Sequence, residues 1–546
     1  MKKHNIFKVV LITTFVMFLF TWIFHAASFS SEYSDEGLVQ MGLSELLNYP
    51  IETFYYFGRF SIFVILVGGF YGVLYKIPAY RSFLDKIVKV FDGKEMLLIA
   101  IISVLLACGV SVAGLHLAIV VFIPFIVSLI LLMGYDKIVA AMTVVGSLAA
   151  GFIGLTYSTS NTSVITTTLN LKSDYQIGVR IVILLVAIVL VLFNIYMYVK
   201  ANSTKKIVEK AVKPEEKKEE VVVKAEVKKT NSTSSKKSSS NSKSGKTQGK
   251  KKSGAKSGSK SGSKSGKNSN KAALRDEDII VVKESVVDSE DSDYLIPSRV
   301  ESGHKIWPFV TFFVLLFALL VLGFVNWGEG GFGLKVFDKA TEGFLSYTLF
   351  GFPIFSKIYG AVTAFGTWSV LNLIVPMALI LVLLVIIYNV KLDDAFDGFA
   401  EGAKKALGPA VIFILVYNIL VMTTYHPFQL TFYHFILGKG PGFNIVTTMI
   451  VTLLSGIFNV DPVYSFQAIL SYYPSVITKV DNYSVTAIIT QSMYGFAVLF
   501  APTSYILMCV LSYLKVDYCA WLKSIWKLLL ELFVILLIIF IILALI

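Results

Sequence analysis

The sequence predicts an all-α polytopic membrane protein built from two inverted structural repeats, with re-entrant hairpins, broken helices and additional scaffold helices. Three observations support this prediction: an apolar composition, apolar runs of membrane-spanning length, and the same order of segments in both halves of the chain. Of the 546 residues, 55% are hydrophobic and 16% are charged, and the mean hydropathy is +0.71. Soluble domains are roughly half apolar and about a quarter charged.

The apolar residues are gathered in long runs, which include Val9–Phe24, Ile62–Leu74, Ile181–Tyr198, Phe309–Val325, Leu371–Tyr388 and Leu528–Ile546. Several of them approach the roughly 20 residues that cross a bilayer core of about 30 Å. Because these runs are apolar on all sides, one-sided surface helices are excluded. The first run is longer than the apolar region of a signal peptide, so we expect an uncleaved membrane helix there.

The positive charge is concentrated in one segment. Residues 201–275 hold 22 of the 49 Lys and Arg but only 6 of the 36 Asp and Glu, so the net charge of +13 does not indicate a nucleic-acid partner. A stretch so rich in Lys, Ser and Gly has too little to bury and is expected to be disordered. We therefore expect a membrane half at 1–200, a disordered linker at 201–304 and a second membrane half at 305–546. The linker is either a tether on anionic lipid headgroups or a solvated spacer.

The basic segments also orient the chain, because Lys- and Arg-rich loops mark the cytoplasmic side of a membrane. Lys2, Lys3 and Lys8 place the N-terminus inside, together with the linker. The lipid partner is then a bacterial inner (cytoplasmic) membrane, crossed several times.

The two halves show the same order of segments. In the first half these are a span (57–75), an amphipathic helix (79–92), a broken apolar stretch (95–133), a helix from 138 that runs into a polar cluster, and a last span (177–199). In the second half they are 406–423, 427–438, 441–478, a helix from 485 interrupted at 501–504, and 524–546. With two further spans between them (306–326 and 369–390), the number of crossings inverts the second copy. Such repeats are typical of secondary transporters.

Broken helices inside a bilayer leave backbone groups unpaired, which costs several kcal/mol for each group unless they line a cavity or bind a ligand. Freed carbonyls and hydroxyls suit a cation, and the N-termini of half-helices suit a carboxylate. The sequence therefore predicts a secondary active transporter, either a symporter or an antiporter, for a small carboxylate-bearing solute.

The strongest polar cluster within apolar sequence spans residues 158–163. Its candidate site residues are Ser160, Asn161, Thr162 and Ser163, and the first three form a candidate Na⁺ site. Hydroxyl and amide oxygens suit a hard cation, and amide donors suit a carboxylate; the alternative is a loop that caps a helix. The remaining candidates lie at the other presumed breaks and hairpin tips, and are Thr503, Ser504, Ser111, Gly114, Asn459, Ser465, Gln467 and Gln491.

Two ionisable residues, His116 and Asp461, fall near the presumed hairpin tips. An ionisable group inside a membrane is by default a functional hypothesis. Asp461 is expected to bind a substrate ammonium or a coupling proton, and His116 to relay a proton or bind a carboxylate. The alternatives are a turn residue before Pro462 and a hydrogen-bonded core histidine. No Lys or Arg is placed at mid-membrane, so the solute is left open between an amino acid and a C4-dicarboxylate.

Several motifs resemble one family. They are 397–403 (DGFAEGA) with 408–410 (GPA), 501–504 (APTS) with 516–523 (VDYCAWLK), and 134–136 (GYD). On these the chain resembles the YfcC/DcuC-like (C4-dicarboxylate anaerobic carrier-like) family of the ion transporter superfamily. Ser160-Asn161-Thr162 is similar to the Ser-Asn-Thr motif that serves cation and carboxylate in related sodium symporters, whereas the second copy has Pro502-Thr503-Ser504. The resemblance implies a paired-repeat fold, an elevator-type alternating access and a homodimer.

Other function classes remain as alternatives. A channel or a non-transporting membrane scaffold can also contain broken helices. An intramembrane enzyme would need a nucleophile–base pair or a metal motif, and none is visible in the sequence. The three cysteines have no metal or disulfide spacing. We therefore expect no cofactor, with Na⁺ or H⁺ as the candidate coupling ion.

Overall fold

The computed structural model describes residues 6–29, 33–202, 295–298, 305–328, 332–360, 363–438, 443–477, 479 and 482–545. In this part of the chain, eight helices are long and apolar enough to cross a membrane. The strands are confined to one short hairpin. The predicted class of an all-α polytopic membrane protein is therefore confirmed. Most of the predicted disordered linker lies outside the described residues.

The first half contains one N-terminal helix and hairpin followed by a series of long and short helices. They are α1 (Ile6–Ile23), β1 (Ala26–Phe29), β2 (Tyr33–Gly37), α2 (Leu43–Lys76), α3 (Pro78–Val90), α4 (Glu95–Ala113), the 3-10 turn η1 (Ala118–Phe122), α5 (Ile123–Leu132), α6 (Lys137–Ala141), the π-helical turn η2 (Met142–Gly146), α7 (Ser147–Ile153), α8 (Thr159–Thr168) and the helix Ile177–Asn202. α4 and α5 form the predicted broken stretch.

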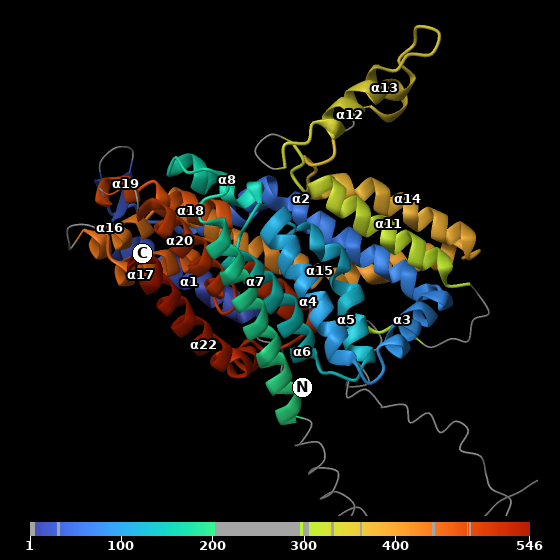
Figure 1. Cartoon of the computed structure of the whole chain (residues 1–546), viewed down its shortest axis with the longest axis horizontal. Coiled ribbons are helices and arrows are strands. Elements are labelled where there is room, and N and C mark those ends of the chain that lie inside the picture. The colour runs from blue at the N-terminus through green and yellow to red at the C-terminus, as the bar shows by residue number, and fades with distance from the viewer. Residues whose placement is uncertain are drawn as a thin grey trace, which may run out of the picture. The chain divides into compact units, whose positions relative to one another are not determined.

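The second half shows a similar order of helices from residue 392 on, after the additional helices between residues 307 and 387. Its elements are α11 (Trp307–Phe324), α12 (Val336–Ser346), α13 (Ile354–Tyr359), η3 (Val370–Leu373), α14 (Ile374–Ile387), α15 (Leu392–Tyr425), α16 (Gln429–Leu437), α17 (Ile445–Phe458), α18 (Pro462–Leu470), α19 (Tyr473–Val476), α20 (Asn482–Val498), α21 (Tyr505–Leu514) and α22 (Tyr518–Leu545). Figure 1 shows the long helices of both series packed together, while α12 and α13 project away from them.

The longest helices of the two halves, α2 and α15, pack against each other along their length (Figure 1). At one end, Lys76 Nζ lies 3.0 Å from Glu401 Oε2. At the other end, Tyr49 Oη lies 2.9 Å from His426 Nε2. The start of one helix therefore meets the end of the other, and the pair is antiparallel. Inverted repeats require this arrangement of equivalent helices, although the inverted relation of all segments remains a prediction.

Glycines bring the two backbones into direct contact where α2 crosses α15. A Cβ added at Gly72 would lie 2.0 Å from the carbonyl oxygen of Gly398, and one added at Gly402 would lie 2.1 Å from the carbonyl oxygen of Gly68. No methyl group fits at such distances. Small residues that allow close backbone approach are a main source of helix association inside a bilayer.

Both helices are longer than the predicted spans. The apolar runs 57–75 and 406–423 become helices Leu43–Lys76 and Leu392–Tyr425, each of 34 residues. The added turns contain charged and polar residues, so hydropathy alone does not include them. Because polar residues such as Glu and Lys are good helix formers, the helices continue beyond the apolar runs.

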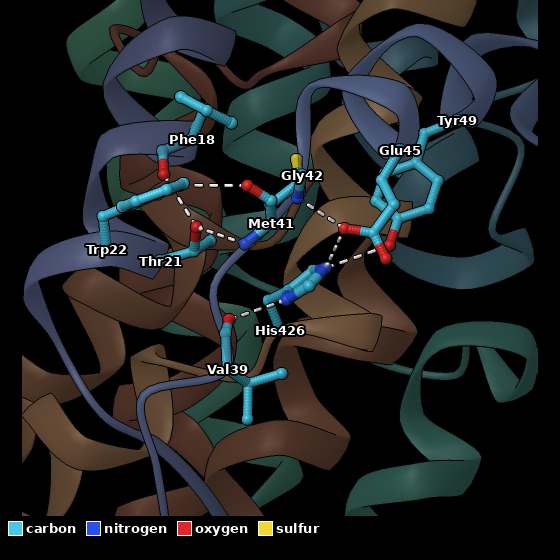
Figure 2. Close-up of polar contacts among 9 residues, drawn as sticks. All are labelled: Phe18, Thr21, Trp22, Val39, Met41, Gly42, Glu45, Tyr49 and His426. Atoms are coloured by element: carbon cyan, nitrogen blue, oxygen red, sulfur yellow. Dashed lines mark hydrogen bonds and ion pairs between the residues drawn. The ribbon is translucent and has the colours of Figure 1, made fainter.

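A network of polar contacts fixes the segment before α2 against α1 and α15 (Figure 2). The backbone of Met41 accepts a hydrogen bond from Trp22 Nε1 at 2.9 Å and donates one to Thr21 Oγ1 at 3.2 Å. His426 Nδ1 lies 2.8 Å from the carbonyl oxygen of Val39. Since His426 is only 4% exposed, this network ties the loop to the buried end of α15.

Candidate functional site

The first break separates α7 from α8 and covers residues 154–158. It is joined to the end of α4 through Ser111. The carbonyl oxygen of Ser111 accepts hydrogen bonds from the backbone N–H groups of Thr156 (2.9 Å) and Ser158 (3.2 Å), and its Oγ donates to the carbonyl oxygen of Gly154 (2.6 Å). The tip of the first hairpin and the first break are thus one hydrogen-bonded unit.

Gly114 brings the hairpin tip against the start of α8. Its φ of 68° is left-handed, which favours glycine. A Cβ at this position would lie 2.1 Å from Ser160 Oγ and 2.8 Å from Ser158 Oγ, with Asn161 Nδ2 at 3.3 Å. The predicted residues Ser111, Gly114, Ser160 and Asn161 are therefore brought together.

The polar cluster 158–163 is not itself the unwound segment that the sequence suggested. From Thr159 on it forms the first turns of α8, and the break lies just before it. Ser158 organises this start: Asn161 Nδ2 donates to its Oγ at 2.8 Å and Thr162 Oγ1 to its carbonyl oxygen at 2.9 Å. Hydroxyls that bond to backbone carbonyls of the preceding turn can be accommodated in a helix, which explains the difference. Ser163, the last residue of this cluster, lies exposed on α8.

A buried arginine, Arg180, holds the first break from the other side. It lies near the start of the helix Ile177–Asn202 and is 0% exposed. Its Nε donates to the carbonyl oxygen of Leu155 at 2.6 Å, and one terminal nitrogen donates to that of Thr156. The other terminal nitrogen donates to the carbonyl oxygens of Ser173 (3.0 Å) and Tyr175 (3.3 Å). The sequence analysis did not single out Arg180 as a site residue, but the structure buries it at the first break.

The charge of Arg180 has no acidic partner within ion-pair distance among the described residues. Its guanidinium instead lies 4.1 Å from the centre of the Tyr175 ring. The carbonyl oxygens of Leu155 and Thr156 point to this cation, so they are not free to bind another one. The guanidinium at this break lies close to the start of α8, whose N-terminus carries a partial positive charge.

Residues of α20, in the second half, complete the first break. Gln491 Nε2 donates to the carbonyl oxygen of Leu155 at 3.2 Å, and its Oε1 accepts from Tyr175 Oη at 3.0 Å. Ser492 Oγ donates to the carbonyl oxygen of Ile153 at 2.8 Å. The predicted Gln491 thus belongs to the site, but as a brace of the first break.

The second half contains two breaks, at residues 459–461 between α17 and α18 and at residues 499–504 between α20 and α21. Thr503 Oγ1 joins them by donating to the carbonyl oxygen of Ile457 at 2.5 Å. Ser504 caps α21 and accepts from the N–H of Leu507 at 3.3 Å. Thr503 and Ser504, both predicted site residues, therefore stabilise the fold here, and they lie close to the second hairpin.

Within the second hairpin, Ser455 Oγ donates to the carbonyl oxygen of Ser465 at 2.8 Å. Asn459 Nδ2 donates to the carbonyl oxygen of Ser455 at 3.1 Å. The predicted Asn459 and Ser465 are thus brought together and buried. Gln467 lies exposed on α18 and is not part of this group.

Asp461 combines a capping role with a contact to α15. Its Oδ1 accepts from the N–H of Val463 at 2.9 Å, which caps α18, and its Oδ2 accepts from Tyr417 Oη at 3.0 Å. The neighbouring carbonyl oxygen of Val460 accepts from Tyr494 Oη at 3.0 Å. Since α18 packs against α8, this carboxylate and the first break belong to adjacent elements.

His116 is buried apart from these clusters, at 8% exposure. Its ring lies 5.2 Å from Phe152 and 6.4 Å from Tyr505, and it lines an apolar cavity of about 70 Å³ between α2, α15 and α21. Among the described residues its Nδ1 makes no hydrogen bond of ordinary geometry. The structure does not bring His116 to the carboxylate or to the Ser160 cluster.

The donor set for an ion consists of oxygen atoms only. No group of three or more His, Cys, Asp or Glu side chains that could hold a metal ion occurs among the described residues. At the predicted Na⁺ site, the Asn161 amide and the Thr162 hydroxyl are already hydrogen bonded to Ser158, and the exposed Ser160 hydroxyl lies 3.5 Å from Ser158 Oγ.

In the comparison with known proteins, the family match covers mainly the first half of the chain. Residues 6–241 match the C4-dicarboxylate anaerobic carrier family, which confirms the resemblance expected from the sequence and includes the first break and Arg180. The second-half motifs at 397–410 and 501–523 lie outside the matched residues. A stretch of 143 residues is 29% identical to an uncharacterised protein of Haemophilus influenzae, and it covers 26% of this chain and 27% of that relative. No solved structure matches the chain at a significant level.

Proposed function

We propose that this chain, similar in its first half to C4-dicarboxylate carriers, is a secondary active transporter of a small carboxylate-bearing solute. The family match favours a carrier over an intramembrane enzyme. In this proposal the protein works as a symporter or antiporter in a bacterial inner membrane, with its N-terminus and linker in the cytoplasm. The observation that carries the choice of solute is Arg180, buried at the first break.

A carboxylate fits the first break for two electrostatic reasons. A buried cation is expensive unless it is compensated, and hydrogen bonds to carbonyls do not neutralise it. The N-terminus of α8 adds a partial positive charge directly after the same break, where the N–H groups of Ser158 and Asn161 donate to the carbonyl oxygens of Ser111 and Ser158. Arg180 acts here through its field and by holding the carbonyl oxygens of Leu155 and Thr156, since most of its donors are already in use.

The two candidate solutes make different demands on the charge of Asp461. A dicarboxylate would bring its second carboxylate toward this side chain, so it would require a proton on Asp461 or a nearby cation. An amino acid would instead bring an ammonium group that pairs with the ionised carboxylate. We infer a C4-dicarboxylate as the first candidate, because it agrees with the family match, and an amino acid as the second.

The coupling ion follows from the same geometry. A proton on Asp461 is the first candidate, and Na⁺ at Ser160, Asn161 and Thr162 is the second. Because two of these three side chains are hydrogen bonded to Ser158, Na⁺ would have to replace or share their contacts.

The antiparallel pair α2–α15 supports an alternating-access mechanism in which this pair is the fixed part. Its backbones touch at the glycine crossing and leave no space for sliding. The hairpins and broken helices would then move against it as an elevator. A homodimer formed through the fixed part belongs to the same proposal.

Solute counterflow in proteoliposomes tests the proposal. Vesicles loaded with one of a series of C4 to C6 carboxylates or amino acids are given a trace of the same labelled solute, with and without Na⁺ and at pH 5 to 9. Saturable exchange is expected for a carrier, whereas uptake that rises linearly with the gradient would indicate a channel. Absence of exchange with every solute, by protein that remains folded, would leave a non-transporting scaffold.

Asp461→Asn provides the test of the coupling ion. This change keeps a side chain that can cap α18 but cannot take up a proton. If the variant exchanges solute as the wild type does across pH 5 to 9, the proton is not carried at Asp461. A requirement for Na⁺ that is lost in Ser160→Ala would then favour the second candidate.

A further inference from the structure

Four residues near the end of the linker segment, Leu295-Ile296-Pro297-Ser298, are packed against helices of the first half. Leu295 is 0% exposed. Its carbonyl oxygen accepts hydrogen bonds from Ser128 Oγ at 2.7 Å and from Tyr75 Oη at 3.3 Å. A solvated spacer would have neither the buried side chain nor these bonds, so this part of the linker has a defined place.

A third donor holds the segment two residues later. The carbonyl oxygen of Pro297 accepts from a terminal nitrogen of Arg81 at 2.8 Å. Arg81 is itself oriented by Asp85, whose Oδ1 lies 2.9 Å from Nε. Tyr75, Arg81 and Ser128 come from α2, α3 and α5 respectively. The segment therefore connects the second arm of the re-entrant hairpin, α5, with the α2–α3 arm.

The segment also closes one end of a crevice. Pro297 and Ser298 line a cavity of about 360 Å³, whose other walls come from α2, α5, α15 and α21. This cavity shares four lining residues with the 70 Å³ cavity that reaches His116, namely Gly68, Pro124, Ala406 and Tyr513. The two cavities are thus neighbouring parts of one crevice that leads from the linker segment to the tip of the first hairpin.

We propose that residues 295–298 are a latch, which ties α5 to α2 and α3 and closes the crevice between the hairpin and the α2–α15 pair. When the latch is bound, the hairpin cannot move away from α2 without breaking three hydrogen bonds and exposing Leu295. When it leaves, the crevice opens at the end marked by Lys76 and Glu401. The latch makes the linker a regulator of hairpin movement.

Two physical features make such a latch reversible. Its contact is short, with one buried apolar side chain and two accepting carbonyls, so it can open without disturbing the fold around it. Its release would leave Ser128 Oγ and Tyr75 Oη, which lie 3.2 Å apart, hydrogen bonded to each other, and water in the opened crevice can replace the carbonyl oxygen of Leu295. The bound and released states are therefore both physically accessible, and solute can shift their populations.

A reversible cross-link tests the latch directly. In a variant whose native Cys108, Cys509 and Cys519 are replaced by Ala, Leu295→Cys and Ser128→Cys are combined, and a disulfide is formed with an oxidant. The expected result is a loss of solute exchange that is restored by a reductant, while neither single variant responds to the oxidant. A cross-linked protein that exchanges solute at the uncross-linked rate would overturn the latch.

Labelling of Leu295→Cys gives a readout that does not need transport. In the purified protein this thiol should react with a maleimide at least about tenfold more slowly than in denatured protein, because the site is closed most of the time. Equal rates in both states would show that the segment is not docked and would overturn the proposal. This labelling tests the latch without any transport measurement. If the proposed transport function were wrong, the wild type would show no solute exchange, whatever the labelling rate.

Weakening the latch should have the opposite effect from the cross-link. Arg81→Gln removes the charged donor to Pro297 and is expected to raise the labelling rate of Leu295→Cys by about three- to tenfold. Solute exchange should rise as well if latch opening limits it. Lys86→Gln, on the exposed face of the same helix, is the matched control and should change neither rate. A labelling rate that is the same in the Arg81 variant and the control would count against the latch.

Discussion

The first break, 154–158, and the second, 499–504, occupy equivalent places in the order of elements, but they are stabilised by different chemistry. The first is held by the buried guanidinium of Arg180, which binds the carbonyl oxygens of Leu155 and Thr156. The second is held by neutral groups such as Thr503, and the charge near it is the carboxylate of Asp461. The two halves thus have breaks at equivalent positions, but the first half contributes a positive charge and the second a negative one.

The bracing between the halves is also one-sided. Gln491 and Ser492 of the second half donate to the first break. In the part of the chain that the structure describes, no first-half side chain is hydrogen bonded to residues 459–461 or 499–504. The first break is therefore braced by both halves, whereas the second is braced within its own half.

The largest effect is expected for Arg180→Gln, which removes the charge from the first break. The change leaves buried carbonyl oxygens without donors, so it should lower the free energy of unfolding by about 2–4 kcal/mol. Solute exchange should fall by about tenfold or more. Thermal unfolding in detergent and counterflow in proteoliposomes measure the two effects.

Lys172→Gln is the control for this variant, since Lys172 is a nearby exposed cation. It should behave as the wild type in both measurements. If Arg180→Gln matches this control in both thermal unfolding and solute exchange, the charge of Arg180 at the first break contributes neither to stability nor to transport.

A smaller effect is expected for the neutral braces, and their coupling to Arg180 tests the one-sided arrangement. Gln491→Leu and Thr503→Val should each lower the free energy of unfolding by about 1–2 kcal/mol. Gln491 shares the carbonyl oxygen of Leu155 with Arg180, so the double variant with Arg180→Gln should be non-additive. Thr503→Val should be additive with Arg180→Gln.

Double-mutant cycles by thermal or detergent unfolding measure this coupling. Coupling of equal size for Gln491 and Thr503 would contradict the view that the two breaks are separate units.

For Asp461→Asn the expected change is in function more than in stability. Asparagine can still cap α18 with its oxygen, and its amide nitrogen can donate to Tyr417 Oη, so the free energy of unfolding should change by less than about 1 kcal/mol. Solute exchange should lose its dependence on pH if the carboxylate carries the coupling proton. Tyr417→Phe is the comparison variant: it removes one hydrogen bond that positions the Asp461 carboxylate but keeps the charge.

The smallest effect is expected outside both breaks, at the exposed pair His25 and Asp35 of the N-terminal hairpin. The side-chain hydrogen bond from His25, followed by the N–H of Gly37, lowers the pKa of Asp35 below its ordinary value of 3.8. A lowered pKa in the folded state gives stability that is present above the unfolded value and is lost as the pH falls below it. Protection of residues 26–37 against proteolysis should therefore weaken slightly below about pH 4.

In Asp35→Asn this loss of protection should be absent. A loss of the same size in both proteins would assign it to other groups.

Much of the fold could be predicted because its signals are local. Apolar runs predict the spans, and the Gly and Ser residues at 109–114 predict the end of α4, where Gly114 has a positive φ. The interruption at 501–504 was also placed correctly, because Pro502 and Ser504 end one helix and cap the next.

The rest depends on contacts between distant residues. The first break lies four residues earlier than the polar cluster suggested, because Ser158 accepts from Asn161 and Thr162 and so starts α8 at this cluster. The burial of Arg180 is not predictable from its surroundings in the sequence, because it stands near the edge of an apolar run, where a long side chain is expected to reach the membrane surface. Only the fold shows that it turns inward to residues 155 and 156. A single Arg close after Gly178, at the start of such a run, was the available signal.

The glycine crossing of α2 and α15 has a consequence for how the protein is assembled. Because these two helices recognise each other through their backbones, the connection between the halves need not direct their pairing. Two separately expressed chains, 1–202 and 295–546, should therefore find each other in the membrane and complement one another in the same cell. The halves would behave as subunits of a heterodimer whose genes happen to be fused.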